Sequence, residues 1–262
     1  MNQIAPVPRV GEETGGGRRR VRKGLLQRLV DEIVSGQFPE GGTLPNETEL
    51  AERFQVSRTA LREAMQHMGA QGLLRSRTRA GTIVMPQENW NYLDPQILEA
   101  ALRYRTDDRF YLSLLDARRL LEPAAAALAA ASADEEAREA IRVALDAMVE
   151  ANDRDGEAWS RADLAFHTAI INASENWVYQ QFVSAIRAAL LSSFRLTNRA
   201  SQSHEDAIRM HRDVWDAIDM RRPDAARGAM ERLIDLARSE IADALRVARS
   251  DALVARADEA YS

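Results

Sequence analysis

The chain has 262 residues, 45% hydrophobic and 29% charged, a composition typical of globular proteins and a length that favours two domains. It has no cysteine, which excludes disulfides and thiolate metal sites and suits a cytoplasmic protein, and no apolar run is long enough to span a membrane. Residues 1–86 hold 13 Lys and Arg against 9 Asp and Glu, whereas residues 87–262 hold 22 against 31. Only residues 1–86 therefore carry a net positive charge that suits binding to a polyanion.

Residues 1–24 are rich in Gly, Pro and Arg and lack the apolar core of a secretion signal. We expect a disordered basic arm. The basic cluster from Arg18 to Lys23 could contact a polyanion, or it could be only a solvated charged segment.

Residues 25–86 begin with three short predicted helices. The first covers residues 25–36, with one apolar stripe and a terminal glycine. The second covers residues 48–54, and the third runs from residue 58 to about 71. Only three residues separate the last two, and two short helices around so tight a corner predict a helix-turn-helix.

The third predicted helix has polar and apolar residues on different faces. At 100° per residue, Arg58, Thr59 and Arg62 lie close together, while an apolar stripe formed by Leu61, Ala64, Met65 and Met68 lies beside them. Ser57 is the expected N-cap, and this helix start suits phosphate oxygens and guanine edges. The alternative is an ordinary amphipathic surface helix.

Residues 75–84 alternate as two strands around a tip at Ala80 and Gly81. Arginine recurs at every second position, at Arg75, Arg77 and Arg79. The pattern predicts a hairpin, or wing, that could reach the minor groove or the DNA backbone.

Residues 38–65, 72–74 and 80–84 together resemble the DNA-binding domain of the GntR family of bacterial regulators almost throughout. The resemblance implies that Arg58, Thr59 and Arg62 contact operator DNA and that Gly81 approaches the minor groove. Thr48 stands where many members carry arginine, so one contact is expected to be altered. The complete predicted DNA-binding set is Ser57, Arg58, Thr59, Arg62, Arg77, Arg79 and Gly81.

Beyond the wing, residues 87–94 are expected to be a linker, and Asp94 followed by Pro95 predicts the start of a new helix. The remaining chain reads as helix almost throughout, with a kink at Pro123. Helices are predicted near residues 95–104, 108–131, 134–153, 157–173, 175–198, 204–220 and 223–249. The expected fold is mainly α: an N-terminal winged helix-turn-helix, a helical domain over residues 95–250 and a tail over 251–262.

Residues 95–245 resemble the FadR-type effector domain, or FCD domain, through segments 118–124, 163–167, 210–218 and 225–230. The resemblance implies an antiparallel helical bundle that binds an effector and dimerises. Residues 90–95 resemble the linker of the subgroup that responds to sugar acids, especially galactonate-type aldonates.

Asp163 and His167 lie four residues apart, on one face of a predicted helix, and a bundle could bring His211 opposite them. Three such ligands suit a divalent metal, Zn or Ni rather than Mg. The resemblance implies a further histidine where this chain has Leu233. Alternatively, the three residues are satisfied core groups, or they bind the hydroxyls of a polyol.

Arg118 lies on the inward side of its predicted helix, between Leu114 and Leu121. A buried guanidinium needs an anion, which Glu122 one turn later could supply. The resemblance implies a different partner, a ligand carboxylate. Weaker candidates for effector contacts are Asn172, Asn176 and Thr197.

These features predict a DNA-binding repressor that a small carboxylate, such as an aldonate, releases from DNA. A homodimer on a palindromic duplex operator is expected, because one winged domain makes few base contacts, and no membrane is involved. The alternatives are a metal-dependent hydrolase-like enzyme, for which no base or nucleophile is evident, and a DNA-binding protein without a ligand.

Overall fold

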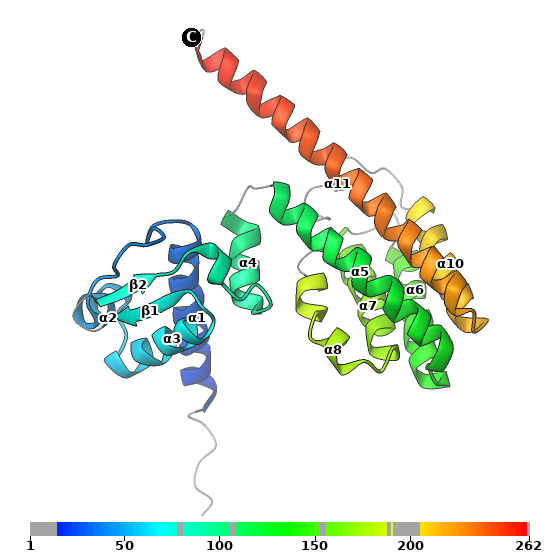
Figure 1. The fold of residues 1–262 in the computed structure, drawn as a ribbon, viewed down its shortest axis with the longest axis horizontal. Helices are drawn as coiled ribbons and strands as arrows, with labels where there is room; N and C mark the ends of the chain where they lie inside the picture. Colours follow the sequence, from blue (N-terminus) through cyan, green and yellow to red (C-terminus); the bar gives the residue numbers. More distant parts are fainter. Residues whose placement is uncertain are drawn as a thin grey trace, which may run out of the picture. The chain divides into compact units, whose positions relative to one another are not determined.

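The computed structural model describes residues 15–77, 81–104, 108–151, 156–187, 190 and 205–260, with side chains for all but 15–23, 248–249 and 251–260. The chain forms two compact units, Met1–Tyr104 and Arg105–Ser262. Figure 1 labels the elements of each unit. The predicted fold class, a small winged helix-turn-helix followed by a helical bundle, is confirmed.

The first unit contains helix α1 (Gly15–Val34), α2 (Glu47–Phe54), α3 (Arg58–Ala70), strands β1 (Leu74–Arg77) and β2 (Gly81–Val84), the short 3₁₀ helix η1 (Gln87–Asn89) and α4 (Pro95–Tyr104). Its core is built around Leu29, Leu50, Leu61 and Met68, all at most 1% exposed. The buried residues of α2 and α3 are spaced as the sequence predicts for two amphipathic helices.

The corner between α2 and α3 is fixed by local chemistry. A capping box at Asn46 begins α2, and Gln55 ends it in the left-handed conformation, with φ 55°. Ser57 then accepts a hydrogen bond from the Ala60 backbone N–H and begins α3, so its predicted N-cap role is confirmed.

The wing is an antiparallel hairpin in which Leu74 pairs with Val84 and Arg77 pairs with Gly81. Thr43 bridges to Ile83 on the outer side of β2. The expected tip residue Ala80 and the predicted contact Arg79 lie outside the described residues.

The segment expected to be a linker packs against the helix-turn-helix. Trp90 is buried and donates from Nε1 to the Met85 carbonyl at 2.9 Å, and Asn91 donates from Nδ2 to Gln71 Oε1 at 2.6 Å. Gly72 allows this approach: it has φ +80°, and a Cβ there would stand 2.0 Å from the Asn89 carbonyl oxygen.

Helix α4 belongs to this unit, whereas the sequence analysis assigned residues 95–104 to the helical domain. Asp94 Oδ1 accepts the backbone N–H groups of Gln96 and Ile97, so its predicted capping role is confirmed. Arg103 of α4 binds Asp31 of α1 at 2.8 Å. The assignment by pattern failed because helical periodicity does not reveal which core buries the apolar face.

Two further helix boundaries differ from prediction. Helix α1 begins at Gly15, so the disorder expected over residues 1–24 is wrong for residues 15–24, and residues 1–14 lie outside the described residues. Arg and Lys are good helix formers and can extend a helix that the apolar stripe has nucleated.

The predicted helix over residues 175–198 is interrupted: α8 (Trp177–Gln180) is followed by a turn at 181–182 before helix resumes over 183–187.

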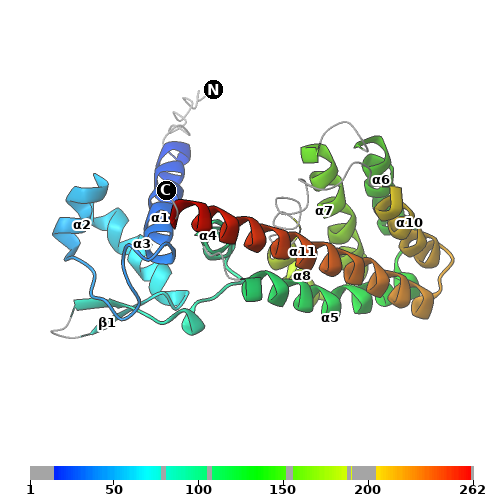
Figure 2. The same cartoon turned by 90° about the horizontal axis from the view of Figure 1, so that it is seen from above.

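The second unit contains α5 (Asp108–Ser132), α6 (Glu135–Ala151), α7 (Gly156–Ala173), α8, α10 (Glu205–Asp219) and α11 (Pro223–Ala260). Helix α5 packs against α7 and α11, and α6 packs against α7 and α10. Figure 2 shows α11 running alongside α5. Pro123 lies inside α5, which continues on both sides of it.

The bundle core is lined by one large apolar cluster that includes Phe166, Ile170, Met148 and Leu233. Alanines of α5, among them Ala126 and Ala129, are fully buried, and their small side chains let neighbouring helices come close. This packing brings charged side chains of three helices into one buried group. Among the described residues, no helix has the length and apolar character needed to cross a membrane.

Candidate functional site

The N-terminal end of α3 presents the polar face that the sequence predicts for DNA contact. Arg58, Thr59 and Arg62 are exposed, whereas Leu61, Ala64 and Met68 of the same helix are buried. Arg62 also binds Glu47 of α2, with 2.6 Å between Nε and Oε2. Because both side chains are exposed, DNA phosphates could displace this ion pair at little energetic cost.

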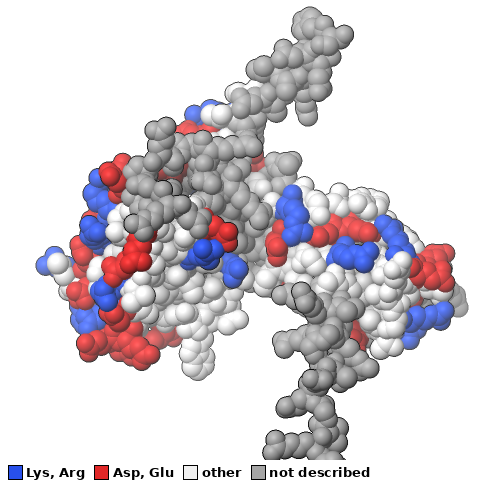
Figure 3. Space-filling model, turned by 180° about the vertical axis from the view of Figure 1, so that it is seen from behind, with Lys and Arg blue, Asp and Glu red and all other residues white. Residues whose placement is uncertain are grey.

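Arg77 and Gly81 face each other at the outer end of the described wing. Arg77 is exposed, and Gly81 has φ +80°, a conformation that favours glycine. On the face seen in Figure 3, basic and acidic side chains are interleaved. The candidate DNA surface is identified by the start of α3 and the described end of the wing.

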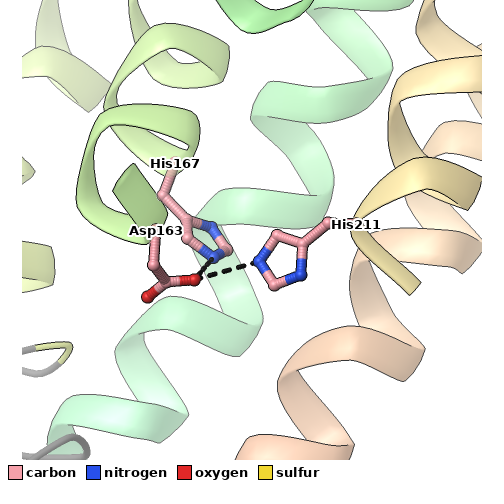
Figure 4. Close-up of side chains that lie close together, drawn as sticks. All are labelled: Asp163, His167 and His211. Atoms are coloured by element: carbon pink, nitrogen blue, oxygen red, sulfur yellow. Dashed lines mark hydrogen bonds and ion pairs between the residues drawn. The ribbon is translucent and has the colours of Figure 1, made fainter. Parts of the chain in front are cut away.

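A second candidate site lies inside the bundle, where α7 contributes Asp163 and His167 and α10 contributes His211 (Figure 4). The His211 Nε2 lies 3.0 Å from Asp163 Oδ1, and the His167 Nε2 lies 3.6 Å from the same oxygen. One ligand atom from each residue lies within 4.8 Å of the others. The structure thus brings together the three residues that the sequence analysis proposed as metal ligands.

The nitrogen of each ring that points away from Asp163 is also held. His211 Nδ1 lies 2.7 Å from the Ala207 carbonyl oxygen, to which it donates, whereas His167 Nδ1 forms an ion pair with Glu122 Oε2 at 2.5 Å, outside the angles of a hydrogen bond. Histidines that bind metals usually donate their other ring N–H to a carbonyl or carboxylate. Two imidazoles and a carboxylate also form a donor set that Zn or Ni accepts, so these residues fit a divalent cation.

Arg118 and Glu122 of α5 complete the buried group. Arg118 Nε donates to Glu122 Oε1 at 2.6 Å, and Arg118 Nη2 lies 3.3 Å from His167 Nε2. Arg118 is 2% exposed and Glu122 is 0% exposed. The partner left open by the sequence is therefore Glu122 in this structure, and the guanidinium also reaches the candidate cation site.

The buried charges shift one another's pKa values. Burial opposes ionisation of Asp163, but hydrogen bonds from His167 and His211 outweigh it and hold the pKa of Asp163 far below its usual range. Burial also disfavours a charged His167, but the Glu122 carboxylate raises the pKa of His167 to about 9. Burial likewise opposes ionisation of Glu122, yet Arg118 and His167 lower its pKa to about 2.

The weaker effector candidates do not join this group. Asn172 is exposed and lines a surface groove of about 780 Å³ between α6 and α7 that none of the five clustered residues lines. Asn176 caps α8 by accepting the backbone N–H groups of Val178 and Tyr179. Thr197 lies outside the described residues, and Leu233 is buried in the bundle core.

Sequence reasoning missed two contacts in the group, those of Glu122 and of Arg118 with His167. The four-residue spacing of Arg118 and Glu122 was visible, but the contacts to His167 depend on how α5 packs against α7. No local pattern marks that packing.

Comparisons with known proteins agree with both halves of the chain. Residues 21–84 match the model of the bacterial regulatory proteins of the gntR family, and residues 113–236 match the FCD domain. The galactonate operon transcriptional repressor of Escherichia coli (strain K12) is 33% identical over 206 residues, covering 78% of this chain and 90% of that protein.

A second relative is the HTH-type transcriptional regulator LutR of Bacillus subtilis (strain 168), 37% identical over 169 residues, with 64% of this chain and 74% of LutR covered. Among solved structures, Lar, which controls the expression of the Listeria monocytogenes agr system, aligns with a TM-score of 0.61 and 19% identity. That alignment covers 85% of this chain and 96% of Lar, and it supports the fold.

Proposed function

Since the chain belongs to the GntR family of bacterial regulatory proteins, as a transcription regulator with an FCD domain, we propose that it is a repressor whose DNA binding is relieved by a small carboxylate. Sugar acids of the aldonate type are the favoured class. Arg58, Thr59, Arg62, Arg77 and Gly81 form the described part of the DNA surface.

Asp163, His167 and His211 are proposed to hold a divalent cation, Zn or Ni. The convergence of two histidine Nε2 atoms on one Asp163 oxygen supports this assignment. When bound, the cation supplies positive charge and open coordination positions for ligand oxygens. Asp163 and the two rings hold it, and the anchored Nδ1 atoms keep both rings turned toward it.

The observation that carries the carboxylate assignment is the position of Arg118. Its Nη2 lies 3.3 Å from His167 Nε2, and its charge is buried. A dication, Arg118, Asp163 and Glu122 together carry a net charge of about +1 when His167 gives its Nε2 lone pair to the cation. A buried site with that excess favours an anion, and a carboxylate can meet both the cation and the guanidinium.

Sugar acids are favoured among carboxylates for two reasons. The linker residues from Trp90 to Pro95 resemble those of the sugar-acid subgroup, and one relative is named for galactonate. Polyol hydroxyls also need polar partners in a buried site, which histidine and aspartate provide.

Regulation is proposed to act through a homodimer on a palindromic operator. A ligand can change DNA affinity only if it binds the DNA-competent and incompetent arrangements differently. The coupling free energy between effector binding and DNA binding in such proteins is about 1 to 3 kcal/mol.

A metal-dependent hydrolase is the less favoured reading. The relatives are transcription regulators, and the buried carboxylate beside the candidate ligands, Glu122, already binds Arg118 and His167. Such a carboxylate is poorly placed to act as a general base.

A thermal-shift screen tests the proposal. Aldonates should raise the melting temperature of the zinc- or nickel-loaded protein, and a chelator or Asp163→Asn should abolish the effect. Asp213→Asn, an exposed change on α10, is the matched control and should respond like the unmodified protein.

In parallel, fluorescence anisotropy with duplexes from the neighbourhood of the gene should show salt-sensitive binding that an active aldonate weakens. The carboxylate proposal is wrong if no small carboxylate changes either the melting temperature or the DNA affinity.

A further inference from the structure

The two histidines of the candidate cation site are oriented by different means. His211 is held by the backbone of its own helix, because Nδ1 donates to the Ala207 carbonyl one turn earlier in α10. Within the described part of the chain, no backbone carbonyl accepts from His167 Nδ1. Its Nδ1 instead meets Glu122, which belongs to α5.

Glu122 is well suited to hold a ring in place. Arg118 donates to both of its carboxylate oxygens, from Nε to Oε1 at 2.6 Å and from Nη2 to Oε2 at 3.4 Å, and Oε2 also lies 2.5 Å from His167 Nδ1. All three side chains are at least 97% buried, so few rearrangements are open to them. The carboxylate therefore has one fixed direction, toward His167.

The direction of the Glu122 carboxylate decides where Nε2, on the opposite side of the His167 ring, points. With Nδ1 facing Glu122, Nε2 of His167 lies on the side of Asp163, 3.6 Å from Oδ1, and 3.3 Å from Arg118 Nη2, a contact that a bound cation would replace. A carboxylate partner at Nδ1 fixes the tautomer and makes the imidazole a stronger ligand. A ring rotated away from Glu122 would direct Nε2 away from the site.

We propose that Glu122 is the positioning residue of the cation site, holding His167 so that Nε2 binds the cation, and that Arg118 keeps Glu122 in place. This inference rests on the proposed cation site and adds to it. Arg118 then has two roles, anchoring Glu122 through Nε and Nη2 and facing the ligand through Nη2.

The test begins with Glu122→Gln, which keeps the side-chain size and removes the charge. The apparent zinc affinity, measured by competition with a chromophoric chelator, should fall about 10- to 100-fold. Glu139→Gln breaks an Arg–Glu pair on exposed α6 and should leave the affinity unchanged.

Histidine ¹⁵N NMR supplies a readout that a purely structural role would not move. In the zinc-loaded unmodified protein, both His167 and His211 should carry the proton on Nδ1. In Glu122→Gln, the His167 signals should show mixed tautomers or a mobile ring, while those of His211, anchored by Ala207, should stay as they were. The chain has only four histidines, so the signals can be assigned by substitution.

Because Glu122→Gln leaves Arg118 buried without its partner, a second variant is needed. Arg118→Met combined with Glu122→Gln removes the unpaired cation, and it should still show weak zinc binding and an unanchored His167. Recovery of normal zinc affinity in the double variant would mean that Glu122 serves only to neutralise Arg118, and the inference would be wrong.

Two failures are distinguishable. If the unmodified protein takes up neither zinc nor nickel, the proposed cation site is wrong, and this inference fails with it. If it takes up zinc and the Glu122→Gln variant binds equally well with an unchanged His167 tautomer, only the inference fails.

Discussion

Arg118 and Glu122 are charged residues in the middle of a helix whose buried side is otherwise largely alanine. Burying charge is unfavourable unless each group is paired and hydrogen-bonded, and a hydrophobic pair in their place is often no less stable. Their presence is therefore better explained by the site than by the stability of the bundle. Asp163 and His167 on α7 are likewise better explained by the site than by the stability of the bundle.

One expected consequence is a pH-dependent stability of the metal-free protein. Folding raises the pKa of His167 to about 9, because the Glu122 carboxylate outweighs the opposing effect of burial. The folded state thus binds this proton more tightly, and its contribution is full below about pH 6.5 and lost as the pH rises through 9. The free energy of unfolding should fall by on the order of 2 to 3 kcal/mol over that window.

Urea denaturation in excess chelator measures this slope. His167→Gln should remove most of it, since no proton is then released in the window. An unmodified protein with equal unfolding free energies at both ends would show that His167 is not held by Glu122 in solution.

Arg62 provides a prediction at the DNA surface. Arg62→Ala should weaken binding to the operator duplex by about 1 to 3 kcal/mol, because one guanidinium contact is lost. Fluorescence anisotropy at fixed salt measures the loss. Aldonate binding should be unchanged, and an equal loss of both activities would argue against two separable sites.

Gly72 gives a backbone prediction. Gly72→Ala should destabilise the first unit by more than about 1 kcal/mol, because φ is +80° and the new Cβ would meet the Asn89 carbonyl at 2.0 Å. Gly69→Ala is the matched control in α3, where the nearest atom to a new Cβ is 3.8 Å away, and it should be neutral or slightly stabilising. Denaturation followed by circular dichroism compares the two, and equal effects would contradict the expected clash.

At the scale of elements, the sequence predicted helix boundaries best where a single capping residue sets the boundary. Ser57 and Asp94 are local caps, so the starts of α3 and α4 could be located from single residues. The break after α8 could not be found, because the apolar spacing of Val178, Phe182 and Ile186 continues across the turn as if one helix ran through it.

The same distinction applies to the candidate site. Asp163 and His167 share one helix face, so their proximity follows from a four-residue spacing. Their proximity to His211 depended on the resemblance to a bundle. The contact from Glu122 is set by the packing of α5 on α7, which helical periodicity does not specify.

Asp94 supplies the prediction at this scale. It caps α4 and also binds His67 of α3, with 3.2 Å between Oδ2 and Nε2. Asp94→Ala should lower the stability of the first unit by about 1 to 2 kcal/mol and speed amide exchange in α4. Asp134→Ala removes a comparable cap from α6 and should leave α4 exchange as it was. Unchanged α4 exchange in Asp94→Ala would contradict this role.

At the scale of the whole molecule, the chain has two compact units with separate cores. Residues 1–104 hold 14 Lys and Arg against 12 Asp and Glu, and residues 105–262 hold 21 against 28, so the sign of the net charge also differs between the two units. Zinc should therefore slow amide exchange in α5, α7 and α10 and leave α2 and α3 unaffected. Hydrogen exchange with mass spectrometry measures this, and equal protection of α2 would mean that the cation also binds in the first unit.

The attachment of the linker to the DNA-reading helix has one more consequence. Gln71 meets Asn91, and His67 meets Asp94, so the last turn of α3 is fastened to the chain that leads into α4. A displacement of Tyr104, at the end of α4, would then move α3 and α4 together as one rigid body. On the proposed function, an effector would then change operator affinity by moving α3 and α4 together, without unfolding either helix.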